Sequence, residues 1–209
     1  MVKCVGVLAL QGAFLEHVQH LERCVLEKEY DLKVITVKTP EELSRCDALI
    51  IPGGESTAMS LIAQRTGMFP HLRKFVHDPT KATWGTCAGL IYISKELANE
   101  KELVQPLELL QVRVRRNAFG RQAQSFIQSC NFSQFIPGCH DFPAVFIRAP
   151  VIEKILDEEA VKPLFTLDDG FIVAAAQGNN ILATSFHPEL AENDSRFHDW
   201  FLQQFVLKQ

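Results

Sequence analysis

A cysteine between two glycines has the plainest chemical potential in this chain. Gly85-Thr-Cys87-Ala-Gly89 has the form of a nucleophile elbow, the strained strand-to-helix turn that lifts a nucleophile out of a sheet. Unpaired N–H groups at the start of the following helix favour the thiolate of such a cysteine. A buried structural cysteine with nearby glycines is the alternative interpretation, so the motif needs further reactive residues beside it.

A histidine and a glutamate are the expected companions of Cys87. Phe186-His187-Pro-Glu189 follows a predicted strand at 181–185, and α/β sheets place their sites at the carboxyl ends of strands. His187 can act as general base while Glu189 fixes its tautomer. Residues two apart on an extended segment project to one side, so both are expected to face Cys87. A surface histidine beside a helix-capping glutamate is the alternative.

Paired glycines mark a third segment. Residues 47–57 run from a strand into a helix through Gly53-Gly54, where the backbone N–H groups can be aimed into a cavity, as an oxyanion hole requires. Gly54 and Ala88 are the expected N–H donors. The alternative is an ordinary strand-to-helix turn capped by Ser56.

Alternating strands and helices must position these segments. Apolar runs and amphipathic spacing predict strands at Val5–Leu10, Lys33–Val37 and Ala48–Ile51, and helices at Ala13–Lys28, Ser56–Arg65 and Cys87–Leu97. Repeated strand, helix and strand imply parallel strands with right-handed crossovers.

The second half of the chain predicts antiparallel pairing. Hairpin signals separate β-rich runs at Pro163–Leu167, Phe171–Ala176 and Ile181–Phe186, and a turn-rich connection separates Gln111–Arg115 from Ser125–Gln128. A closing helix is expected from about Asp194, with its Phe and Trp stripe in the core. The prediction is one α/β domain over 1–209, a three-layer, flavodoxin-like fold with a mixed, mainly parallel sheet flanked by helices.

Composition excludes several classes of protein. The chain has 209 residues, 47% of them hydrophobic, and a net charge of −4 without runs of like charge, which argues against disorder and against nucleic-acid binding. Six cysteines without a CxxC pair predict reduced thiols and a cytoplasmic protein. No apolar run approaches the ~18 residues of a membrane span.

The three chemical segments, with three further motifs, resemble the class I (triad) glutamine amidotransferases. Within that class the chain is similar to the glutaminase subunits of pyridoxal 5′-phosphate synthase, the PdxT/Sno family. The resemblance extends over essentially the whole chain and rests on these separate motifs: Leu8-Ala-Leu-Gln-Gly-Ala13 with Glu16-His17, Pro52-Gly-Gly-Glu-Ser-Thr57, Gly85-Thr-Cys-Ala-Gly89, Arg116-Asn-Ala-Phe-Gly-Arg-Gln122, Phe146-Ile-Arg-Ala-Pro150 and His187-Pro-Glu-Leu190. Ala58 and Gln124 depart from residues common in the family, and neither belongs to the triad.

The resemblance implies a role for each matched residue. Cys87 is the nucleophile, His187 the base, Glu189 its partner, and Gly54 and Ala88 the oxyanion donors. The glutamine site is formed by Gly54, Glu55, Ser56, Arg116, Ile147 and Arg148. Glu55 suits the α-ammonium group, and the planar fork of an arginine suits the α-carboxylate.

The implied reaction is hydrolysis of L-glutamine to glutamate and ammonia, without a metal or cofactor. The resemblance further implies that the ammonia passes to a (β/α)8-barrel synthase subunit that builds pyridoxal 5′-phosphate. Because paired glycines can flip a peptide at little steric cost, a resting loop with a carbonyl in the oxyanion site would make activity depend on synthase docking.

Three alternatives remain open at this stage. The chain can be the glutaminase subunit of another amidotransferase, such as that of the histidine pathway, although RNAFGRQ and FIRAP argue against it. It can be a cysteine peptidase of the related elbow fold, although those proteins place His after the nucleophile and Ala88 stands here. It can also be a non-catalytic regulatory subunit of the synthase, although the intact triad argues against that.

Two other clusters are interpreted as structural. His17, His20 and Cys24 share a helical face, but a structural zinc site needs four ligands, so a partly buried helix face near the family's synthase-docking surface is preferred. Four arginines between Arg113 and Arg121 are too few for a nucleic-acid patch and are expected beside a carboxylate-binding site.

Overall fold

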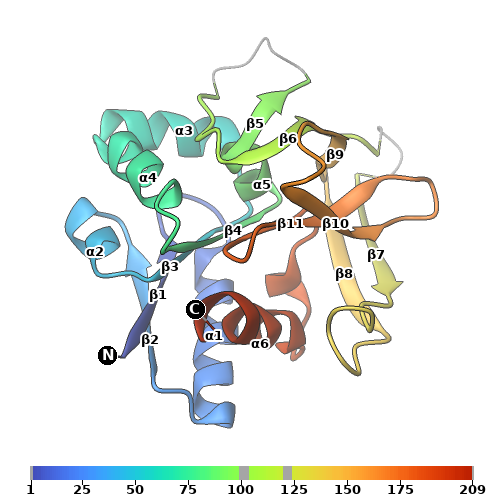
Figure 1. Ribbon diagram of the computed structural model, residues 1–209, viewed down its shortest axis with the longest axis horizontal. Helices are drawn as coiled ribbons and strands as arrows, with labels where there is room; N and C mark the ends of the chain where they lie inside the picture. The colour runs from blue at the N-terminus through green and yellow to red at the C-terminus, as the bar shows by residue number, and fades with distance from the viewer. Residues whose placement is uncertain (1, 99–103, 120–123, 209) are drawn as a thin grey trace.

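A sheet whose neighbouring strands come from distant parts of the chain dominates the computed structural model, which describes residues 2–98, 104–119 and 124–208 (Figure 1). Its parallel half contains, in spatial order, β2 (Leu32–Val37), β1 (Lys3–Leu8), β3 (Ala48–Ile51), β4 (Ala82–Thr86) and β12 (Ile181–Thr184). With β12 taken as the fifth strand, this is the flavodoxin-like order 2-1-3-4-5.

Beyond β12 the sheet becomes mostly antiparallel. It continues through β11 (Ile172–Gln177), β9 (Val151–Ile155), β6 (Leu110–Arg115) and β5 (Ser94–Leu97), while β10 (Val161–Thr166) pairs with β11. Only β5 and β6 run parallel in this half of the described sheet. A separate antiparallel hairpin consists of β7 (Ser125–Cys130) and β8 (Phe142–Ile147).

Helices cover both faces of the parallel half because its strands are apolar on both sides. Alternate strand residues such as Val5 and Ile50 pack with α1 (Phe14–Lys28) and α6 (Arg196–Phe201), which continues as a π-helical turn over Leu202–Val206. Residues of the opposite parity, such as Leu49, pack with the second layer of helices, α2 (Pro40–Ser44), α3 (Ser56–Arg65), α4 (Met68–Val76) and α5 (Ala88–Ile93). The three-layer α/β prediction is therefore confirmed.

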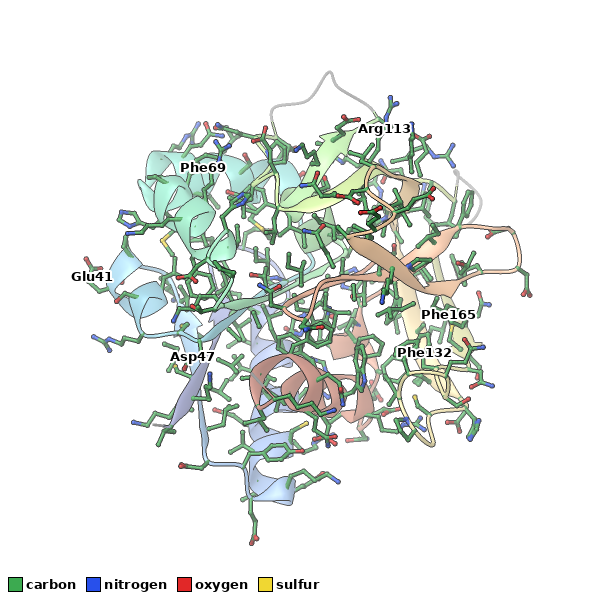
Figure 2. All side chains as sticks on the ribbon, in the orientation of Figure 1. Glu41, Asp47, Phe69, Arg113, Phe132 and Phe165 are labelled. Carbon is green, nitrogen blue, oxygen red and sulfur yellow. The ribbon has the colours of Figure 1, made fainter. Side chains whose placement is uncertain are left out.

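An aromatic cluster joins the closing helix to the second half of the chain. Phe132 contacts Phe165 edge-on at 4.9 Å between ring centroids, and Figure 2 labels both rings. Phe197 of α6 lies 5.5 Å from Phe132 and 5.4 Å from Phe186, which immediately precedes His187. The predicted aromatic stripe is confirmed as core, and its packing against Phe186 fixes the chain just before His187.

Two predicted helix boundaries are wrong. The helix predicted over 87–97 ends at Ile93, because Ser94 turns to an extended conformation, its hydroxyl donates to the Ile91 carbonyl at 2.8 Å, and the chain continues as β5 beside β6. Tertiary pairing here overrides the helix preference of Lys, Glu and Leu. The closing helix begins at Arg196 rather than Asp194, whose carboxylate instead accepts from the Arg196 N–H.

The sequence pattern missed α2, α4, β8 and β9, gave no bounds for β4 and predicted β5 as helix. Strands β8 and β9 are separated only by Arg148-Ala-Pro150, so no long turn signal divides them. The predicted hairpins of β10, β11 and β12 and the helix at Ser56–Arg65 are confirmed.

Candidate active site

Cys87 occupies the tight turn between β4 and α5. Its backbone has φ 48° and ψ −102°, a conformation that costs energy for a residue with a side chain and is typical of nucleophile elbows. The flanking glycines are required, because a Cβ on Gly89 would clash with the carbonyl of Ile51 and one on Gly85 would lie 2.7 Å from the Gly89 carbonyl. The Cys87 N–H donates to the Thr184 carbonyl of β12 at 2.8 Å.

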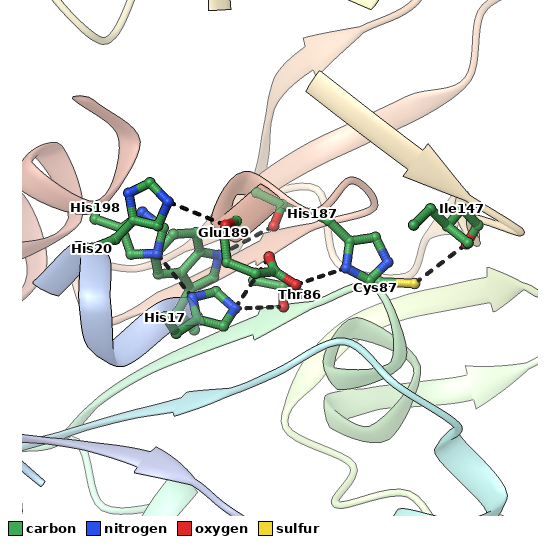
Figure 3. A network of polar contacts seen from close by, with 10 residues as sticks. His17, His20, Thr86, Cys87, Ile147, His187, Glu189 and His198 are labelled. Atoms are coloured by element: carbon green, nitrogen blue, oxygen red, sulfur yellow. Dashed lines mark hydrogen bonds and ion pairs between the residues drawn. The ribbon is translucent and has the colours of Figure 1, made fainter. Parts of the chain in front are cut away.

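His187 and Glu189 complete a buried polar row with Cys87. The Nδ1 atom of His187 lies 2.7 Å from Oε1 of Glu189, and the two residues are 6% and 3% exposed. Figure 3 shows His187 between the cysteine and the glutamate. Because Nδ1 is committed to Glu189, Nε2 is the ring nitrogen left for exchanging protons with the thiol.

The relative placement of His187 and Glu189 corrects one expectation. Pro188–Leu190 forms a 3₁₀ turn and not an extended segment. Glu189 consequently lies behind His187 and does not face Cys87 (Figure 3). A Pro at the first position of the turn favours this conformation, since its φ is fixed near the helical value.

Burial and neighbouring polar groups shift the pKa values of His187 and Glu189. Burial lowers the pKa of His187, but hydrogen bonds and charge interactions with Cys87 and Glu189 outweigh burial and raise it to about 10. For Glu189, burial acts to raise the pKa, and the imidazoles of His17 and His187 hold it below its ordinary value. A protonated His187 beside an ionised Glu189 is therefore the favoured state at neutral pH.

A cavity of about 270 Å³ opens onto the thiol of Cys87. Its walls contain every residue predicted for the site except Glu189: Gly54, Glu55, Ser56, Cys87, Ala88, Arg116, Ile147, Arg148 and His187. Ile91 and Asn117 also line it and were not predicted individually, although Asn117 belongs to the Arg116-Asn-Ala-Phe motif. The later part of that motif, including Arg121, lies outside the described residues.

The glycine loop of the cavity is held by the segment after β1. The Gly53 carbonyl accepts from the Ala13 N–H at 2.9 Å, and the Gln11 side-chain oxygen accepts from the Glu55 N–H at 2.8 Å. Gly12 has φ +94°, and a Cβ there would clash with the Gly53 carbonyl. A trans peptide points its C=O and N–H in opposite directions, so the Gly54 N–H is directed away from Ala13.

Glu55 caps helix α3, a role that one alternative had given to Ser56. Its carboxylate accepts from the N–H groups of Thr57 at 2.9 Å and Ala58 at 2.7 Å. The Glu55 carboxylate is also 3.7 Å from an Arg116 nitrogen. Burial acts to raise the pKa of Glu55, and the two backbone hydrogen bonds lower it to below its ordinary value. A cation and an anion thus stand side by side at one end of the cavity.

The Ser56 hydroxyl and the Ile147 carbonyl also line this cavity. Ser56 Oγ is buried and has no hydrogen-bond partner among the described residues. The Ile147 carbonyl lies 3.9 Å from the Cys87 sulfur, and the adjoining Arg148 has φ 45°. These polar atoms give the cavity several places to hold a small polar molecule.

A larger cavity of about 620 Å³ lies between α1 and the start of α6. It contains Cys24, whose pKa burial raises to about 12, together with charged side chains of both signs. A thiol with so high a pKa is a poor nucleophile. The smaller cavity at Cys87 is therefore the better candidate for chemistry.

The other residues weighed in the sequence have structural partners. Arg113 and Arg115 lie 3.5 and 3.8 Å from the Glu153 carboxylate. Both ring nitrogens of His17 and of His20 contact protein atoms. Among the described residues, none of the helices has the length and apolar character that crossing a bilayer demands.

Comparisons with known proteins agree with this geometry. The model of the SNO glutamine amidotransferase family matches residues 7–207. The chain belongs to this family. Its predicted class I amidotransferase resemblance is confirmed, and with it the peptidase and histidine-pathway alternatives are excluded.

Individual relatives of this amidotransferase cover nearly its whole length. Pyridoxal 5′-phosphate synthase subunit SNO1 of Saccharomyces cerevisiae is 66% identical over 98% of this chain and 94% of its own. Pyridoxal 5′-phosphate synthase subunit PdxT of Dehalococcoides mccartyi is 45% identical, with 95% of each chain covered. A crystal structure of a glutamine amidotransferase aligns with TM-score 0.80 and 42% identity over 96% of this chain and 97% of that one.

Proposed function

We propose that the cavity at Cys87 hydrolyses L-glutamine to glutamate and ammonia, and that the ammonia feeds a pyridoxal 5′-phosphate synthase for vitamin B6 synthesis. The observation that carries the proposal is the buried row Cys87, His187 and Glu189, whose first two members line a cavity, with the 2.7 Å contact between the last two. Membership of a glutamine amidotransferase family supports the substrate. The printed names of the relatives support the partner.

The first half-reaction forms a thioester. The Cys87 thiolate attacks the side-chain amide carbon, and the carbonyl oxygen becomes an oxyanion facing the N–H groups of Gly54 and Ala88. The His187 imidazolium then donates its Nε2 proton to the amide nitrogen. Ammonia leaves, and the carbon–sulfur bond remains.

The second half-reaction regenerates the enzyme. Neutral His187 takes a proton from water, and the resulting hydroxide attacks the thioester carbon. The carbon–sulfur bond breaks, glutamate leaves, and the thiolate–imidazolium pair is restored. Glu189 remains ionised throughout and keeps the Nδ1 proton of His187 in place.

The charged pair beside the cavity orients the amino acid. Glu55 attracts the α-ammonium group, and Arg116 binds the α-carboxylate through its planar fork. The unpartnered hydroxyl of Ser56 and the backbone of Ile147 and Arg148 supply further hydrogen bonds. These contacts leave the side-chain amide as the part of glutamine directed toward Cys87.

The synthase subunit is proposed to be a (β/α)8 barrel and to dock on α1. Leu15 and Leu26 of this helix are 56% and 80% exposed, and their separation of eleven residues places them on one face. Exposed apolar residues on one face are typical of an interaction surface. We place the complex in the cytoplasm, where the six free thiols of the chain remain reduced.

Docking on α1 explains how the partner controls hydrolysis. The segment that leads into α1 supplies the Ala13 N–H and the Gln11 oxygen that hold the glycine loop. In this proposal the described loop is the competent arrangement, and the free chain also visits a flipped peptide that fills the oxyanion site. Full glutaminase activity of the isolated chain contradicts this conditional mechanism.

The test is glutamate formation from L-glutamine with and without the cognate synthase subunit, for wild type and Cys87→Ala. We expect activity on mixing with the synthase subunit and a loss of at least about 10³-fold in the variant, because removal of a nucleophile abolishes the covalent route. A Cys87→Ala complex that still supports glutamine-dependent synthesis would instead establish a non-catalytic regulatory subunit.

A further inference from the structure

Three buried histidines lie behind the carboxylate of Glu189. His17 and His198 have no exposed surface, and His20 is 6% exposed. His17 Nε2 lies 3.3 Å from Glu189 Oε2, and His17 Nδ1 lies 2.9 Å from His198 Nε2. Figure 3 shows that these rings extend the row of Cys87, His187 and Glu189 into the core.

The nitrogen without a partner at the far end of this row determines which ring nitrogens of His198 and His17 carry a proton. His198 Nδ1 is buried and has no hydrogen-bond partner among the described residues. A buried N–H without an acceptor costs about 1–3 kcal/mol, so the His198 proton belongs on Nε2. This N–H donates to His17 Nδ1, which must then be the unprotonated nitrogen of that ring.

His17 is consequently a neutral imidazole with its proton on Nε2. Burial lowers the pKa of His17 to about 4, against the opposing charge of Glu189. His17 Nε2 is hydrogen-bonded to the Thr86 hydroxyl oxygen at 3.2 Å and lies 3.3 Å from Glu189 Oε2. Glu189 Oε2 is buried and has no hydrogen-bond partner among the described residues, so its contact with the His17 N–H is an electrostatic one.

We propose that His17 is a positioning residue for the triad, a role that rests on the proposed function. Its Nε2–H lies against one carboxylate oxygen of Glu189, with 3.3 Å between nitrogen and oxygen, while the Nδ1–H of His187 binds the other, so the carboxylate is held in the plane that orients His187. His198 sets the tautomer of His17.

The neighbouring His20 provides a matched control. It lies on the same helix, and its ring is stacked on His198 at 4.7 Å. Its Nε2 contacts the Glu189 main-chain oxygen at 3.1 Å and its Nδ1 contacts the Ser195 hydroxyl at 2.9 Å. His20 therefore contacts the Glu189 backbone but no carboxylate oxygen.

The kinetic test compares His17→Leu, His17→Gln and His20→Gln in complex with the synthase subunit. We expect kcat for glutamine to fall about 10–100-fold in His17→Leu, as for other partners that orient a reactive group, with KM changed less than about threefold. His17→Gln keeps an N–H near the Nε2 position and should retain kcat within about threefold. His20→Gln should do the same, with any loss confined to thermal stability.

The second test determines the histidine tautomers directly in the wild-type protein. A long-range ¹H–¹⁵N spectrum of the histidine-labelled chain near pH 7, with His17→Gln used for assignment, should show His17 and His198 as neutral Nε2–H tautomers. Protonation of His17 at Nδ1 or at both nitrogens overturns the inference. So does a kcat loss that is equal in His17→Leu and His17→Gln, or absent in both.

These outcomes are separate from failure of the proposed function. A wild-type complex that produces no glutamate refutes the glutaminase proposal. A wild-type complex that is active beside an equally active His17→Leu complex refutes only the positioning role.

Discussion

Gly53 shows at the residue scale how little space surrounds the reacting groups. A Cβ at this position would clash with His187 Cε1 and lie 2.6 Å from His187 Nδ1 and 3.3 Å from the Cys87 Cβ. The lack of a side chain at Gly53 therefore allows the His187 imidazole to lie close to the glycine loop. None of these three atoms is the free end of a flexible side chain.

We expect Gly53→Ala to lower kcat for glutamine at least about 100-fold, because a displacement of about 1 Å at reacting groups has effects of this size. Steady-state glutaminase assays of the complex, with circular dichroism to establish folding, measure the effect. A folded Gly53→Ala complex with wild-type kcat would show that the loop and His187 can move apart freely.

Helix α1 has two different faces at the scale of the element. The buried face carries His17, His20, Leu21 and Cys24, and the opposite face carries the exposed Leu15 and Leu26. One helix thus connects the proposed partner surface to the interior behind the triad. Residues that precede it also hold the glycine loop.

Leu26→Glu should weaken binding of the synthase subunit about tenfold or more, since apolar contacts at the centre of an interface commonly contribute more than about 1 kcal/mol. Isothermal titration calorimetry measures the dissociation constant, and saturating synthase should restore glutaminase activity. Leu207→Glu, at a position that is 36% exposed beyond the closing helix, is the control. Equal weakening by both variants, or by neither, argues against docking on α1.

The sequence predicted which site segments come together better than it predicted the bounds of the elements around them. The motif segments follow β3, β4 and β12, and parallel neighbours must bring their carboxyl ends together. The 3₁₀ turn at Glu189 and the end of α5 at Ile93 depend on tertiary contacts that periodicity does not record. Gln11 contacts Glu55, and His17 contacts Glu189, across segments that are distant in sequence. Local residue spacing therefore could not predict either contact.

Stability of the whole molecule depends on keeping the histidine cluster neutral. The folded pKa of His17 is about 4, below its ordinary value of 6.5, so the unfolded chain takes up a proton first as pH falls. Its contribution to stability is therefore lost between about pH 6.5 and pH 4. His187 has the opposite sign, because its raised pKa of about 10 gives stability that is present below 6.5 and lost as pH rises toward 10.

We expect the free energy of unfolding to fall more steeply with acid in wild type than in His17→Gln. The difference in slope should increase as pH falls below 6.5 and approach about 1.4 kcal/mol per pH unit between pH 6 and 5, which corresponds to one proton. Urea unfolding at about pH 7, 6 and 5, followed by circular dichroism, measures both slopes. Parallel curves would mean that His17 is already charged in the folded state.

The bond from the Cys87 N–H to the Thr184 carbonyl has a consequence for the order in which a ribosome delivers the chain. The segment with the proposed nucleophile emerges well before the strand that accepts its N–H and before the proposed base, His187. Until β12 inserts between β4 and β11, Cys87 lacks both of these neighbours. If the proposed triad is correct, a nascent chain carries no working hydrolase until its synthesis is almost complete.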